Sequence, residues 1–137
     1  MKKIILPFAF ALFCFAGCNN DDDKNATGLL DTWTLVKAGG GFAGVDYEYE
    51  KSVITVKFTA NGDVVIINNN TDETKPGFFE TGTYDYAVAD KENEFETCEE
   101  SMTIDIAVFY CYQINAQDEL ILDDSPVDGL KYTFVRN

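Results

Sequence analysis

The feature that most constrains the fold is an alternation of apolar and polar residues with a period of two, which runs from about Leu30 to the end of the chain. Ile54, Val56 and Phe58 show it clearly, because they share one face of an extended segment and polar residues separate them. Alternation that is rich in β-branched residues is typical of half-buried β-strands. The sequence therefore predicts an all-β fold.

Eight segments carry this strand pattern and are separated by short turns. They are residues 33–37, 53–59, 64–68, 82–88, 102–108, 109–114, 120–123 and 130–135. Asn61-Gly62 lies between the second and third and predicts a tight hairpin, since both residues tolerate positive φ. Eight sequential antiparallel strands predict a small up-and-down barrel, which leaves no sheet edge exposed. A two-sheet sandwich is the alternative.

The N-terminus carries a different signal. Met1-Lys2-Lys3 is positively charged, and the apolar run that follows, residues 4–17, is too short for a helix that spans a bilayer. This pattern predicts a secretory signal peptide over residues 1–17, with a buried core helix as the alternative.

The signal segment ends in Phe15-Ala16-Gly17-Cys18, which resembles the lipobox of bacterial lipoproteins. The resemblance implies cleavage before Cys18 and acylation of that residue, so that several acyl chains anchor the protein durably. The acidic stretch after Cys18 predicts a solvated tether over residues 18–28 and resembles the surface-export signal of some Gram-negative bacteria. We therefore expect an outer-membrane lipoprotein exposed at the cell surface, with a plain linker as the alternative for the acidic stretch.

Several short motifs follow one another along residues 29–137. They are Leu29-Leu30-Asp31-Thr32-Trp33-Thr34-Leu35-Val36, Phe58-Thr59-Ala60-Asn61-Gly62, Gly82-Thr83-Tyr84, Leu120-Ile121-Leu122 and Tyr132-Thr133-Phe134. Together they resemble the small lipocalin-like lipoprotein domains of bacteria. The resemblance implies one barrel domain over residues 29–137, with Trp33 plugging its closed end.

The four cysteines divide by position. Cys14 lies in the predicted signal peptide and Cys18 is the predicted lipidation site, which leaves Cys98 and Cys111 in the domain. Export would place this pair where disulfides persist, and we expect them to be bridged. Two buried free thiols are the alternative.

Charge and composition exclude several classes of function. Residues 1–17 hold two lysines and no acid, so the remaining chain has 24 acidic and 8 basic residues and a net charge of −16. Such a charge disfavours binding to nucleic acid and permits cationic partners. The chain has no histidine, which excludes Ser-His, Cys-His and His-metal mechanisms.

The acidic residues show no catalytic or metal-binding pattern. Glu99-Glu100 and Asp123-Asp124 are adjacent pairs of the kind that a chain rich in acids produces by chance. Asp123, Asp124 and Asp128 share a loop, but their spacing does not match an EF-hand. We therefore expect no enzyme activity, no metal site and no cofactor.

Aromatic residues are the candidate ligand contacts. Tyrosines with same-face spacing and two phenylalanines are expected to point into the barrel; these are Tyr84, Tyr86, Tyr110, Tyr112, Tyr132, Phe58 and Phe134. If the barrel is hollow, they would line a cavity for a small apolar or amphipathic ligand. If it is solid, they would fill the core. The alternative function is an acidic protein-interaction module, such as an inhibitor of a cationic secreted enzyme like lysozyme, which the charge would attract.

Overall fold

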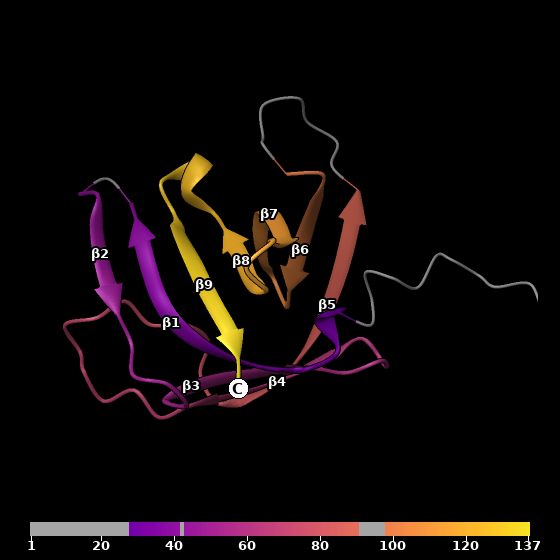
Figure 1. Cartoon of the computed structure of the whole chain (residues 1–137), viewed down its shortest axis with the longest axis horizontal. Coiled ribbons are helices and arrows are strands. Elements are labelled where there is room, and N and C mark those ends of the chain that lie inside the picture. The colour runs from indigo at the N-terminus through magenta and orange to yellow at the C-terminus, as the bar shows by residue number, and fades with distance from the viewer. Residues whose placement is uncertain (1–27, 42, 91–97) are drawn as a thin grey trace, which may run out of the picture.

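Nine antiparallel strands make up the computed structural model, which describes residues 28–41, 43–90 and 98–137 (Figure 1). The predicted signal peptide, Cys18 and the tether up to residue 27 lie outside the described residues. The strands are β1 (Thr32–Gly40), β2 (Val45–Glu48), β3 (Ile54–Phe58), β4 (Asp63–Asn68), β5 (Gly82–Asp90), β6 (Glu100–Ile104), β7 (Ala107–Ile114), β8 (Glu119–Asp123) and β9 (Leu130–Arg136).

Eight of these strands close into a barrel. β1 and then β3 to β9 pair in sequence order, and β9 pairs back with β1, from Trp33 opposite Arg136 to Gly40 opposite Leu130. This arrangement confirms the predicted all-β up-and-down barrel. Closure leaves the eight barrel strands paired on both sides, which removes the edges on which other chains could pair.

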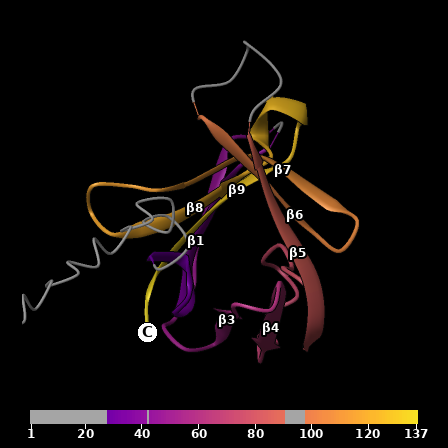
Figure 2. The same ribbon diagram turned by 90° about the vertical axis from the view of Figure 1, so that its right-hand side faces the viewer.

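Because neighbouring strands run in opposite directions, successive connections lie at alternate ends of the barrel. The β1–β2, β4–β5, β6–β7 and β8–β9 connections lie at one end, here called the loop end. The start of β1 and the end of β9 lie at the other, here called the closed end. In both views the short 3-10 helix η2 (Ser125–Val127) of the β8–β9 connection lies far from the C-terminus (Figures 1 and 2).

The second strand, β2, is absent from the sequence-based prediction. It pairs with the second half of β1, whose first half pairs with β3. Only one of its four residues, Tyr47, is even half-buried, and Lys37 holds it through an ion pair to Asp46, 2.7 Å long. A mostly exposed strand has no apolar alternation for sequence reasoning to detect.

The predicted boundary between the fifth and sixth strands is wrong. The sequence predicts one continuous strand over residues 102–108, but the chain reverses at Asp105 and Ile106, and Ile104 pairs with Ala107. Asp105 has a φ of 52° and Ile106 is 90% exposed. Aspartate tolerates the left-handed region, so the turn forms without the glycine that would have marked it.

A β-bulge in β7 changes which of its residues face the core. Glu100 pairs with Tyr112 and Met102 pairs with Phe109, so β7 carries one more residue than β6 between these pairs. Phe109 and Tyr112 both belong to the buried cluster, whereas Tyr110 belongs neither to it nor to the residues packed against it. The expectation that Tyr110 points into the barrel is therefore wrong, because the bulge breaks the period of two.

Cys98 and Cys111 lie at disulfide-bonding distance, with their Cα atoms 5.3 Å apart. Both side chains are buried. The bridge ties the segment before β6 to the bulged part of β7. This confirms the predicted pairing.

Candidate functional site

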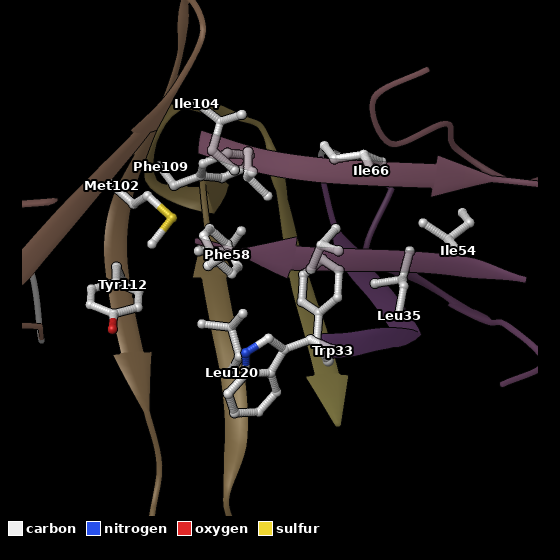
Figure 3. Packing of buried hydrophobic residues seen from close by; sticks show 14 of the residues in the cluster. Trp33, Leu35, Ile54, Phe58, Ile66, Met102, Ile104, Phe109, Tyr112 and Leu120 are labelled. Atoms are coloured by element: carbon white, nitrogen blue, oxygen red, sulfur yellow. The ribbon is translucent and has the colours of Figure 1, made fainter. Parts of the chain in front are cut away.

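Large apolar side chains fill the middle of the barrel. Trp33, Phe58 and Met102 point into the same interior from three different strands (Figure 3). Phe58 is 2% exposed and Phe134 is fully buried, so both of these predicted ligand contacts are part of the packed core. Native cores are packed to the density of organic crystals and leave little room for a guest. Space for a ligand is therefore expected at the ends of the barrel and not in its middle.

The core cluster and the residues packed against it include four of the five predicted tyrosines, namely Tyr84, Tyr86, Tyr112 and Tyr132. Backbone carbonyls accept a hydrogen bond from two of these hydroxyls. Tyr84 donates to the carbonyl of Glu80 at 3.0 Å, and Tyr86 donates to that of Thr59 at 3.0 Å. Tyr112 is buried, which raises its pKa to about 12. These residues resemble structural tyrosines, each with an apolar body against the core and a polar tip at its rim.

One pocket opens at the loop end and has a volume of about 330 Å³. Its walls come from the β4–β5 loop, the start of β7, the β8–β9 loop and the start of β9. The lining residues are Gly77, Phe78, Phe79, Ala107, Phe109, Asp124, Gly129, Leu130 and Tyr132. Of the seven aromatic residues predicted from the sequence as ligand contacts, Tyr132 alone is among them.

Phe78 forms the floor between this pocket and the core. Its ring centroid lies 5.0 Å from that of Tyr132, 5.3 Å from that of Phe134 and 6.3 Å from that of Phe109. Phe79 lies beside it at 4.9 Å. Sequence analysis missed both phenylalanines because they lie in a loop without strand periodicity, although two consecutive aromatics in a polar loop are a signal worth testing.

The β4–β5 loop is held over the barrel end by hydrogen bonds to neighbouring elements. The hydroxyl of Tyr49 donates to the carbonyl of Pro76 at 2.6 Å, and the side-chain amide of Asn68 donates to the carbonyl of Phe79 at 2.9 Å. The ammonium of Lys75 donates to the carbonyl of Glu48 at 2.7 Å. These bonds fix the backbone on either side of Phe78 and so position its ring.

Asp124 is the one charged residue among the described residues that line the pocket. Its backbone carbonyl accepts from the amides of Val127 and Gly129, which closes the β8–β9 loop on itself. Its carboxylate oxygen Oδ1 is buried and has no hydrogen-bond partner within the described part of the chain. Burial, with the neighbouring charge of Asp123, raises the pKa of Asp124 above its usual value.

Gly129 makes room for this carboxylate. A Cβ atom at that position would come within 2.5 Å of the backbone oxygen and of Oδ2 of Asp124. A side chain at position 129 would displace the loop. The position of the Asp124 carboxylate therefore depends on a glycine at the end of the segment Asp124-Ser125-Pro126-Val127-Asp128-Gly129.

Tyr132 supplies a second polar group. Its hydroxyl lies 3.5 Å from the carbonyl of Gly77, at the outer limit of a hydrogen bond. Burial and then the charge of Asp124 raise the pKa of Tyr132. The pocket thus combines an aromatic wall with a carboxylate and a weakly engaged hydroxyl.

The opposite, closed end is sealed by Trp33 and Arg136. The guanidinium of Arg136 stacks 4.4 Å from the ring centroid of Trp33 and bonds Asp118 through two nitrogens, at 2.6 and 3.0 Å. It also bonds Asp31 at 2.6 Å. The indole of Trp33 donates to the carbonyl of Leu29 at 3.0 Å. These bonds cover the closed end with paired polar groups.

A second recess of about 420 Å³ lies on the outer surface of the barrel, over parts of β1, β7, β8 and β9. Charged and polar side chains of both signs line it, including Lys37, Lys131 and Glu119. It is larger than the loop-end pocket but has no aromatic wall. Small-ligand sites are mostly apolar with a few placed polar groups, which favours the loop-end pocket.

Other kinds of site find no support in the described residues. No group of three or more cysteine, aspartate or glutamate residues there is arranged to hold a metal ion, and this includes the acidic β8–β9 loop. No helix among residues 28–41, 43–90 and 98–137 has the length and apolar character needed to cross a membrane.

Comparison with protein-family models, curated proteins and solved structures found no significant match.

Proposed function

We propose that this chain is a lipid-anchored, extracytoplasmic protein with a lipocalin-like barrel, and that it binds a small amphipathic ligand at the loop end. The closed eight-stranded barrel supports the lipocalin-like interpretation, because it is the architecture that the resemblance implies. The lipobox-like Phe15-Ala16-Gly17-Cys18 supports the anchor, and the close approach of Cys98 and Cys111 fits an exported protein.

The observation that carries the binding function is the aromatic pocket itself. Its volume of about 330 Å³ lies at the lower end of the range for small-molecule sites, roughly 300–1,000 Å³. Since Phe58, Phe134 and Phe78 fill the barrel beneath it, the ligand is small and sits at the mouth rather than deep inside. The apolar wall would hold its body, while Asp124 and Tyr132 would orient its polar end.

Binding is favoured over catalysis for chemical reasons. The chain lacks histidine, and the described residues that line the pocket include one carboxylate and no second one to pair with it. Acid–base hydrolysis by carboxylates needs a pair of such groups in opposed roles.

The binding proposal is tested with 1-naphthalenemethanol, a neutral fluorophore with an apolar body and one hydroxyl. The mature chain, produced with Cys18→Ser so that it stays unacylated, should raise the anisotropy of the probe in a saturable way. Ala107→Trp, which adds a large ring to the pocket wall, should abolish this. Ala116→Trp adds the same ring in the exposed β7–β8 turn and is the matched control. Equal binding by all three proteins would refute the assigned site.

The anchor is tested separately. Cys18→Ala should move the protein from the outer-membrane fraction to the soluble or unprocessed pool and remove lipid labelling. Surface exposure predicts that external protease degrades the wild-type protein on intact cells. Unchanged fractionation of the variant would contradict the lipidation proposal.

A second candidate is an acidic module that docks on a cationic secreted enzyme such as lysozyme. The charge of −16 favours it, and the exposed side chain of Ile106 at the β6–β7 turn would offer an apolar contact. This function predicts inhibition of lysozyme that weakens as salt rises and is reduced by Ile106→Ser. No inhibition at low salt would exclude it for that enzyme.

A further inference from the structure

We infer that the loop-end pocket selects ligands that carry an organic ammonium group, with Asp124 as the counter-ion and the surrounding aromatic rings as the wall. This inference rests on the proposed function, because it names the chemical class of the ligand for the same pocket.

The first support is the unpaired carboxylate oxygen. Oδ1 of Asp124 is buried and accepts no hydrogen bond from the described residues. Buried polar groups are nearly always hydrogen-bonded, and a charged one without a partner is costly. Oδ1 itself is closed to solvent, so what Asp124 offers a ligand in the pocket is the negative charge of a carboxylate that no donor among the described residues offsets at Oδ1. A cationic group gains more from such a charge than a neutral one does.

The second support is the absence of a competing cation in the wall. Within the part of the chain that the structure describes, the lining contains Asp124 and no lysine or arginine. Lys131, which lies opposite Asp123 in the sheet, lines the outer recess instead, and Arg136 is engaged at the closed end. The negative charge in the pocket is therefore not neutralised by its own lining.

The third support is the aromatic wall. Phe78, Phe79, Phe109 and Tyr132 all line the pocket, with the rings of Phe109 and Tyr132 6.1 Å apart and nearly perpendicular. Aromatic faces attract ammonium groups electrostatically, and they do so more strongly where water is excluded. An anionic ligand would meet both the carboxylate and these faces unfavourably.

The same geometry argues against a bare metal ion as the occupant. Ca²⁺ needs six to eight oxygen ligands, and the wall offers one carboxylate. An alkylammonium or arylalkylammonium group needs one acceptor and an apolar surround, which is what the lining supplies.

The test compares two probes with the same body, 1-naphthalenemethylammonium and 1-naphthalenemethanol, on the mature chain carrying Cys18→Ser. Isothermal titration should give an affinity for the ammonium probe about tenfold or more above that for the alcohol. The preference should persist in about 0.5 M salt, which screens the general attraction of an acidic surface for cations.

Two variants assign the preference to its residue. Asp124→Asn should reduce the ratio of the two affinities to near one. Asp85→Asn removes the same charge from an exposed position on β5 and should leave the ratio unchanged. Circular dichroism checks that both variants retain the barrel, and the two-probe ratio of the wild-type chain stands even if a variant fails to fold.

The outcomes separate the inference from the function beneath it. Equal affinity for the two probes in the wild-type chain would overturn the ammonium preference and leave the binding function in place. A preference that survives Asp124→Asn would overturn the role of Asp124. Binding of neither probe would overturn both proposals.

Discussion

Replacing Asp124 by asparagine should make the protein more stable at neutral pH while it weakens ammonium binding. An unsatisfied buried polar group costs about 1–3 kcal/mol, and more if charged. Only one oxygen of Asp124 is buried without a partner and the side chain as a whole is half-buried, so solvent screening reduces the cost. We expect the uncharged, nearly isosteric amide to raise the free energy of unfolding by about 1 kcal/mol, or the melting temperature by about 4 °C for a domain of this size.

The raised pKa of Asp124 determines how the stability difference between the variant and the wild type changes with pH. The pKa of Asp124 is raised in the folded protein, so its protonated form is the one that folding favours. The stability associated with that proton is fully present below the unfolded pKa of about 3.9 and is lost as pH rises through the folded value. The advantage of Asp124→Asn should therefore be small at about pH 3 and reach its full size at neutral pH.

Urea unfolding of both proteins at several pH values measures this directly. Asp85→Asn is again the control for a general reduction of negative charge, and it should gain less. If Asp124→Asn were less stable than the wild type at neutral pH, the carboxylate would be making stabilising contacts, and the argument that it is held for a ligand would fail.

Three further predictions concern the barrel itself. Phe134→Ala should lower the free energy of unfolding by about 3–5 kcal/mol, because this ring is fully buried in the core; a loss below about 1 kcal/mol would contradict a packed interior. The double substitution of Cys98 and Cys111 by serine should cost about 3 kcal/mol under oxidising conditions, and the difference should vanish when reductant opens the wild-type bridge. Arg136→Met should lower the melting temperature and reduce the loss of stability at acid pH. The guanidinium holds the pKa of Asp118 below its usual value, and the stabilisation from this pair is lost as pH falls through that lowered pKa. If stability fell with acid equally in the variant and the wild type, the pair would not contribute.

The sequence was sufficient for the architecture because the barrel depends on patterns that repeat. The apolar faces of β3 and β4 are buried residue for residue as the alternation predicts, with Ile54, Val56 and Phe58 on one strand and Val64 and Ile66 on the next. A period of two leaves little freedom once one face must be buried.

The sequence-based prediction is wrong where a single residue interrupts the alternation of apolar and polar side chains. The bulge in β7 moves Tyr110 off the core face, and the turn at Asp105 divides a segment that alternates without interruption. Neither event changes composition or periodicity enough to be read in advance. The exposed β2 was missed for the opposite reason, since a four-residue strand with little burial carries no pattern at all.

The pocket was the least predictable part. Phe78, Phe79 and Asp124 come from loops, and only closure of the barrel brings these loops together at one end. Strand periodicity directed attention to inward tyrosines, most of which fill or rim the core. Tyr132 was found because it lies on a strand and reaches the loop end.

The most direct test of the central claim is to locate the bound probe by nuclear magnetic resonance. Amide chemical shifts of the labelled mature chain are followed while 1-naphthalenemethylammonium is added. The account predicts saturable changes that are largest around Gly77, Phe79, Gly129 and Tyr132, which surround the loop-end pocket. Changes centred instead on Lys37 and Glu119 at the outer recess, or no saturable change anywhere, would contradict it.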